Sequence, residues 1–158
     1  MDLERKIELM KKYDFLDYRN KLSGIMALLD ILSRGKSPKE KSEKYLKLIR
    51  GSYEWIHDKY NSIDFDELEN EIETEQDKAD FQTLFISKPL IPQLELAVKD
   101  LIYLCRDREF KVNKDSPTFV RLKNICGGLI QADDYQGIRY RRRRHNYEKE
   151  IEESKSNP

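Results

Sequence analysis

The chain has 158 residues, of which 38% are hydrophobic and 38% are charged. This length predicts one domain with a core of its own. Lys and Arg number 30 and Asp and Glu also number 30, so whole-chain charge excludes any bulk attraction to nucleic acid or to an anionic membrane. The N-terminus is charged from its second residue and the apolar runs are shorter than the ~20 residues of a membrane span, which predicts a soluble protein of the cytoplasm or nucleus.

The lean apolar content suits helices that bury one narrow apolar stripe. We therefore expect an all-α fold, a compact bundle of five or six helices with an N-terminal antiparallel hairpin and a charged C-terminal helix. The domain is predicted to span residues 1–153, and residues 154–158 are predicted to form a disordered tail.

Two apolar stripes open the chain out of phase with each other. They predict a break between Lys12 and Phe15, where Asp14 can cap the second helix. Gly35 is suited to end that helix in the left-handed conformation. The run from Ser37 to Glu40 predicts a further helix start, with its serine at the cap and its proline at the first helical position. The two long helices on either side are expected to pair as the hairpin.

The middle of the chain is strongly acidic from Asp64 to Asp80, and a capped helix is predicted to begin there. A later helix is predicted to start at Ser116-Pro117. It contains Gly127-Gly128, which we interpret as a close helix crossing or, alternatively, a break. Both cysteines, Cys105 and Cys126, stand in apolar helical runs and are predicted to be buried, reduced thiols.

The densest basic block of the chain lies near the C-terminus. Arginine forks bind phosphate with two hydrogen bonds, and tyrosine rings stack on unpaired bases, so arginines interleaved with tyrosines are typical of single-stranded nucleic-acid binding. We interpret the chain as a non-enzymatic binding or regulatory module for nucleic acid, with RNA favoured, or for an acidic protein. Arg141 to Arg144 would contact phosphates or carboxylates, and Tyr140 and Tyr147 would stack. The candidate binding residues are Arg139, Tyr140, Arg141, Arg142, Arg143, Arg144, His145 and Tyr147.

Two other interpretations of the chain stay open. The arginine run could be a solvated helix face paired with the acidic residues that follow it, or it could dock on the acidic segment 64–80. The N-terminal hairpin could make a protein-protein adaptor that forms homodimers through an apolar stripe of Leu22, Ile25, Leu29 and Leu32.

Arg139, His145 and Tyr147 resemble the site of the HEPN superfamily of small helical domains. In that superfamily an arginine and a histidine lie a few residues apart near a helix end, often with a tyrosine two places after the histidine. The resemblance implies a metal-independent RNase in which His145 acts as acid or base and Arg139 steadies the phosphate. Tyr140 stands where the family usually has a different polar residue.

The run from Phe15 to Leu22 resembles the dimerisation hairpin of sporulation-type phosphotransferases. Leu16 stands in place of the phosphorylated histidine, which implies a scaffold or a decoy partner for a receiver domain rather than a phosphoryl relay. His57 has no second histidine at ligand spacing, and the chain has no phosphate-binding glycine loop, serine elbow or paired-cysteine motif. We therefore expect no metal, no cofactor and no membrane partner.

Overall fold

The computed structural model describes residues 1–14, 16–111 and 114–156, without the side chains of Leu16, Asp17 and Gln136. The described residues are helical throughout, apart from short connections, and contain no strand. The elements are α1 (Leu3–Lys12), α2 (Leu16–Ser33), α3 (Lys39–Asn61), α4 (Phe65–Glu71), α5 (Glu75–Asp80), α6 (Gln82–Ser87), α7 (Leu90–Asp107), α8 (Pro117–Ala132), a π-helical turn η1 (Asp133–Gly137) and α9 (Ile138–Ser156).

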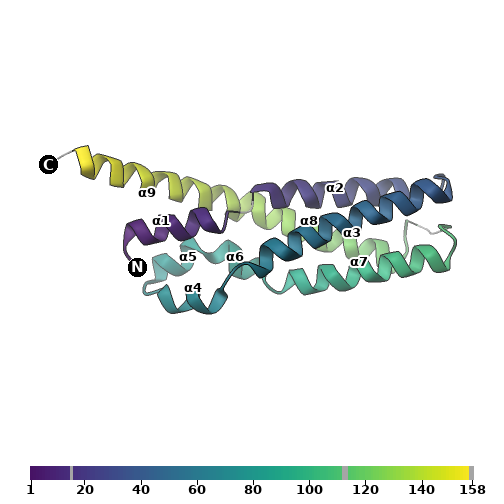
Figure 1. Cartoon of the computed structure of the whole chain (residues 1–158), viewed down its shortest axis with the longest axis horizontal. Coiled ribbons are helices and arrows are strands. Elements are labelled where there is room, and N and C mark those ends of the chain that lie inside the picture. The colour runs from purple at the N-terminus through teal and green to yellow at the C-terminus, as the bar shows by residue number, and fades with distance from the viewer. Residues whose placement is uncertain (15, 112–113, 157–158) are drawn as a thin grey trace.

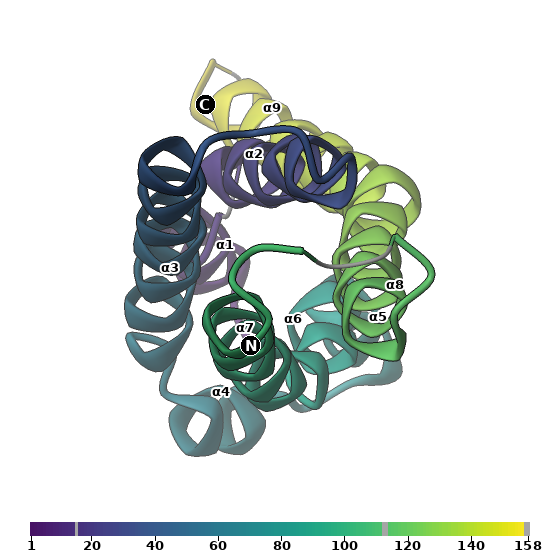
Figure 2. The same cartoon turned by 90° about the vertical axis from the view of Figure 1, so that its right-hand side faces the viewer.

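Four long helices, α2, α3, α7 and α8, form an up-and-down bundle. They stand in a ring in which α2 packs on α3 and α8, and α7 packs on the same two helices (Figure 2). Consecutive members run in opposite directions, because α3 returns along α2 and α8 returns along α7 (Figure 1). Each helix buries an apolar stripe in the centre of the ring, with fully buried side chains that include Leu22, Ile49, Leu101 and Leu122.

A second group of helices covers one end of this bundle. There α1 packs along α9, while α6 contacts α8 and the π turn (Figure 1). Phe81 is fully buried in this group, and its ring lies 6.4 Å, edge to face, from the ring of Tyr140. Tyr140 of α9 is therefore part of the core, although the sequence of this helix has almost no apolar stripe.

The chain is divided more finely than the five or six helices expected. The acidic segment and the residues after it fold as three short helices, α4 to α6, and local hydrogen bonds begin two of them. The carboxylate of Asp64 accepts from the backbone N–H of Glu67 to start α4, as its sequence predicts. Thr74 and Asp77 form a reciprocal capping box at the start of α5.

The helix boundaries near the N-terminus follow the sequence closely. The break after Lys12 is confirmed, since α1 ends there; Phe15, and with it the cap of α2, lies outside the described residues. Gly35 has a φ of 63°, the left-handed conformation expected of it. At the next helix the prediction was wrong by one residue: Pro38 is the cap of α3 rather than its first residue, and no side-chain hydrogen bond caps that end.

The glycine pair neither breaks the helix nor marks a crossing. α8 runs through Gly127 and Gly128, and a Cβ at either position would meet nothing within 4 Å, so both interpretations of the pair were wrong. Cys105 and Cys126 are buried and free, as predicted, and burial raises the pKa of their thiols to about 11 and about 12.

The C-terminal helix is longer than expected. α9 stays helical through Ser156, where a tail from residue 154 was predicted; residues 157 and 158 lie outside the described part. Its last turns project beyond the rest of the molecule (Figure 1). Within the described residues, no helix combines the length and apolar character that crossing a membrane requires.

Candidate nucleic-acid interface

The basic block lies on a continuous helical rod made of α8, the π turn and α9. The rod runs from residue 117 to residue 156, so at 1.5 Å per residue it extends about 60 Å. Nη1 of Arg141, in α9, donates to Oδ1 of Asp133 at the start of the π turn, at 3.3 Å. A Cβ at position 137 would overlap that Asp133 carboxylate, so a larger residue there would displace Asp133 from Arg141. The turn fixes the angle at which α9 leaves the bundle and hence which of its residues face inward.

Three of the arginines face inward and hold α9 in place. Nη1 of Arg144 donates to Oδ2 of Asp14 at 2.7 Å, which ties α9 to the junction of α1 and α2. Nη2 of Arg143 donates to the carbonyl of Ala79 at 3.1 Å. Together with Arg141, these side chains are only 22% to 27% exposed. Docking on the acidic segment, one of the interpretations left open by the sequence, is thus confirmed for Arg143.

The two tyrosines expected to stack on bases also face inward. Tyr140 is 3% exposed and its hydroxyl donates to the carbonyl of Met10 at 2.7 Å; burial raises its pKa above the usual value. Tyr147 is half-buried and its hydroxyl donates to Oδ2 of Asp80 at 2.7 Å. Burial first, and then the neighbouring Asp80, raise the pKa of Tyr147 as well. The ring of Tyr140 is closed to a base in this structure.

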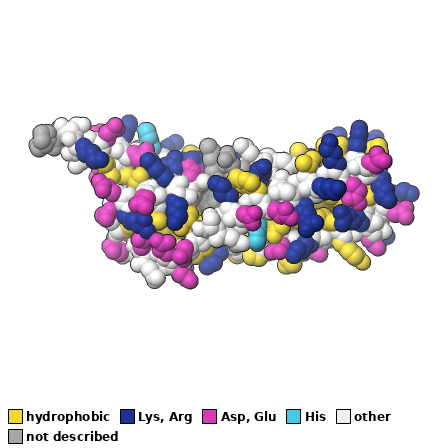
Figure 3. Space-filling view, in the orientation of Figure 1, with side chains coloured by type: hydrophobic (Ala, Val, Ile, Leu, Met, Phe, Trp, Pro, Cys, Tyr) yellow, Lys and Arg dark blue, Asp and Glu magenta, His cyan; other side chains and the backbone are white. Residues whose placement is uncertain are grey.

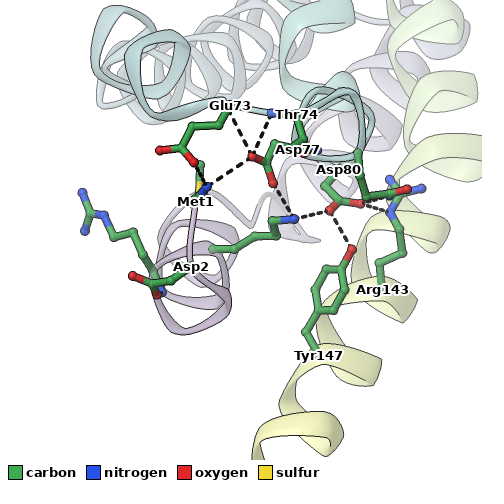
Figure 4. Close-up of polar contacts among 11 residues, drawn as sticks. Met1, Asp2, Glu73, Thr74, Asp77, Asp80, Arg143 and Tyr147 are labelled. Atoms are coloured by element: carbon green, nitrogen blue, oxygen red, sulfur yellow. Dashed lines mark hydrogen bonds and ion pairs between the residues drawn. The ribbon is translucent and has the colours of Figure 1, made fainter.

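A buried charge cluster joins α1, α5 and α9 (Figure 4). Asp80 is fully buried, and Nζ of Lys6 and Nε of Arg143 lie 3.0 and 2.9 Å from its oxygens. Nζ of Lys6 also lies 2.6 Å from Oδ1 of Asp77. Burial alone would lower the pKa of Lys6, but its bonds to the two carboxylates outweigh burial and raise it. Burial would likewise raise the pKa of Asp77, but Lys6 and two backbone N–H groups lower it to about 2.

The opposite face of α9 is exposed and cationic. The side chains of Arg139, Arg142 and His145 are exposed and make no ion pair or hydrogen bond with the part of the chain that the structure describes. At 100° per residue, Arg139, Arg142 and the exposed Lys149 lie within about 80° of one another around the helix axis. Tyr135, which is 70% exposed, precedes Arg139 by one turn. The sequence has no acidic residue from Tyr135 to Tyr147. We call Tyr135, Arg139, Arg142 and Lys149 the outer strip, because these unpaired cations and the exposed aromatic ring lie along the outer face of the helix.

The three residues of the HEPN-like pattern do not converge within one chain. Arg139 and His145 are six residues apart on one helix, which separates them by about 120° around its axis and about 9 Å along it. Tyr147 faces inward against Asp80.

The apolar stripe of the expected dimer interface is used inside the bundle. Leu22, Ile25, Leu29 and Leu32 are each no more than 3% exposed, so a second copy has no access to them in this fold. The phosphotransferase-like position, the side chain of Leu16, lies outside the described residues.

Two other kinds of site, a metal site and a ligand groove, could lie on the rest of the described surface. In the described residues, no group of three or more His, Cys, Asp or Glu side chains is placed to hold a metal ion. A groove of about 620 Å³ is lined by residues of α3 and α7. Charges on its rim are paired within the chain, as in Arg50 with Glu54 and Lys99 with Glu95.

Comparison of the chain with protein-family models, with curated proteins and with solved structures finds no match.

Proposed function

We propose that this protein is a binding module for single-stranded nucleic acid, RNA in the first place, which it contacts through the outer face of α9. The supporting observation is that Arg139 and Arg142 are exposed, have no partner in the described structure and share a strip with the exposed ring of Tyr135. His145 and Lys149 extend the cationic strip. The inward arginines and tyrosines of the original candidate set act differently in this proposal: they orient the helix.

The arrangement suits a flexible, unpaired strand. Arginine binds phosphate oxygens through two parallel N–H groups, and a tyrosine ring stacks on any base, so binding needs no particular sequence. Arg139 and Arg142 are separated by about 4.5 Å along the helix and Arg142 and Lys149 by about 10.5 Å, which suits contact with about three phosphates. The docked base of α9 holds the backbone of this strip in place, so binding has to order only the side chains and the strand.

The test is the affinity for a fluorescent oligo-uridine of about twelve nucleotides, and for its DNA equivalent, measured by anisotropy across a salt series. With three phosphate contacts the slope of log K against log salt concentration is expected near about −2, because each contact to a single strand contributes about −0.7. The variant Arg139→Gln/Arg142→Gln should bind more weakly and lose about 1.4 of that slope.

A matched variant, Lys111→Gln/Lys114→Gln, removes two exposed charges between α7 and α8 and should leave affinity and slope unchanged. A loss confined to this control would contradict the assignment to α9. Absence of salt-dependent binding to either strand would refute the nucleic-acid proposal and leave an acidic protein as the partner class for the strip.

The stacking role of Tyr135 has its own test. Tyr135→Ala should lower affinity by about 1–3 kcal/mol, the range for loss of one base-aromatic stack, while Tyr135→Phe should retain the wild-type affinity. Equal affinities of the two variants would remove Tyr135 from the proposed site.

A further inference from the structure

Two segments at opposite ends of this neutral molecule carry opposite charge. Residues 34–47 contain six Lys and Arg against two Glu, whereas residues 64–80 contain nine Asp and Glu against one Lys. The first segment occupies the end where α2 turns into α3, and the second forms α4 and α5 at the other end (Figure 1). In Figure 3 dark blue side chains gather at the right-hand end, and magenta side chains gather at the lower left, over α4.

The basic end carries an exposed apolar side chain among its lysines. All six of its cations are exposed, and none forms an ion pair with a described residue. Leu48 is 50% exposed on α3, where it follows Lys47 directly and lies one turn after Lys44. This surface therefore presents an apolar knob beside two ammonium groups.

The acidic end offers the complementary features. Asp66, Glu69 and Glu75 are exposed and form no ion pair within the described part of the chain. Of these three, Glu69 lines a shallow hollow of about 490 Å³, whose surface is mainly apolar and includes Ile72 and Phe85. Its other lining residues are Lys78 and Gln82.

We propose that the basic end of one copy docks on the acidic end of a second copy, with Leu48 in the hollow of Ile72 and Phe85. Lys44 and Lys47 then face the carboxylates of Asp66 and Glu69. A second copy is the occupant that fits, because this chain itself carries the knob, the hollow and opposite charges around each. The contact joins two different surfaces, so it leaves a free end on every copy and builds linear chains. The zero net charge of the chain favours this contact between copies, since there is no net electrostatic repulsion between them.

The experiment is sedimentation velocity of nuclease-treated full-length protein over a concentration series at low and at high salt. Wild type should associate reversibly at low salt and be monomeric at high salt. The variants Lys44→Glu/Lys47→Glu and Asp66→Lys/Glu69→Lys should each weaken association by about tenfold or more at low salt, because like charges then face each other. An equimolar mixture of the two variants should associate again, because the altered basic end of one is complementary to the altered acidic end of the other.

Two controls make the result specific. Arg139→Gln/Arg142→Gln changes charge elsewhere and should associate like wild type, so this proposal and the nucleic-acid proposal fail independently. Leu48→Ala should weaken association without altering the far-UV circular dichroism or the melting temperature. Monomers at every concentration, association unaffected by the two charge variants, or no recovery in their mixture would overturn the head-to-tail contact.

Discussion

Asp80 is the residue whose replacement tests the docking of α9 most directly. Asparagine has nearly the same shape, so Asp80→Asn removes the charge without leaving a cavity. The fully buried carboxylate lies 3.0 Å from Nζ of Lys6 and 2.9 Å from Nε of Arg143, and it accepts from Tyr147 and from Gln76. Removing one partner of a buried ion pair costs about 3–5 kcal/mol because the other charge is left without compensation.

The lower part of that range applies to Asp80, since two of its partners keep other contacts. Lys6 retains Asp77 at 2.6 Å, and Arg143 retains the carbonyl of Ala79 at 3.1 Å. We therefore expect a loss of about 3 kcal/mol in the free energy of unfolding.

Urea unfolding followed by circular dichroism measures this change. With a denaturant dependence of about 1–3 kcal/mol per molar urea, the midpoint should fall by about 1 M or more. The control Glu75→Gln changes an exposed carboxylate of the same helix and should stay within about 0.5 kcal/mol of wild type. If Asp80→Asn unfolds at the same urea concentration as this control, the cluster does not hold α9 to the bundle.

Three further predictions concern stability and reactivity. Gly137→Ala should destabilise the fold by about 1–3 kcal/mol through overlap in the π turn, whereas Gly128→Ala, with open space around it, should stabilise α8 by up to about 1 kcal/mol; urea midpoints that move in the same direction would contradict this. Because the pKa of Asp77 is lowered to about 2, about 2 kcal/mol of stability is present above pH 4 and should be lost as the pH falls toward 2; thermal melts of wild type and Asp77→Asn should converge over that range. Cys105 and Cys126 should react with a thiol reagent at pH 8 only as fast as the protein unfolds, and rapid labelling of the native protein would show that they are accessible.

Local signals in the sequence were sufficient for much of the fold. The phase change after Lys12 and the left-handed glycine at position 35 each act over a few residues, and the structure has both features where they were expected. The glycine pair of α8 misled the prediction, because a mid-helix glycine indicates close packing only when a neighbouring element occupies the space beside it.

The division of the arginine block could not be predicted in the same way. A run of consecutive cations has no periodicity, so nothing in it distinguishes the inward-facing Arg143 from the outward-facing Arg142. The distinction comes from contacts distant in sequence: Asp80 precedes its partner Tyr147 by 67 residues. One signal was present, since Lys6 lies three residues after Leu3 and four before Met10, on the apolar face of α1. A lysine on such a stripe indicates a buried acidic partner.

The number of residues in the π turn, Asp133–Gly137, determines how α9 is rotated about its axis. One residue fewer or more in that turn would rotate all of α9 by about 100° around its axis, while leaving its sequence intact. Arg142 would then turn away from solvent, and Arg143 would leave Asp80. Whether a given arginine anchors the helix or faces a partner is therefore decided by the residue count of a segment that contains no arginine at all.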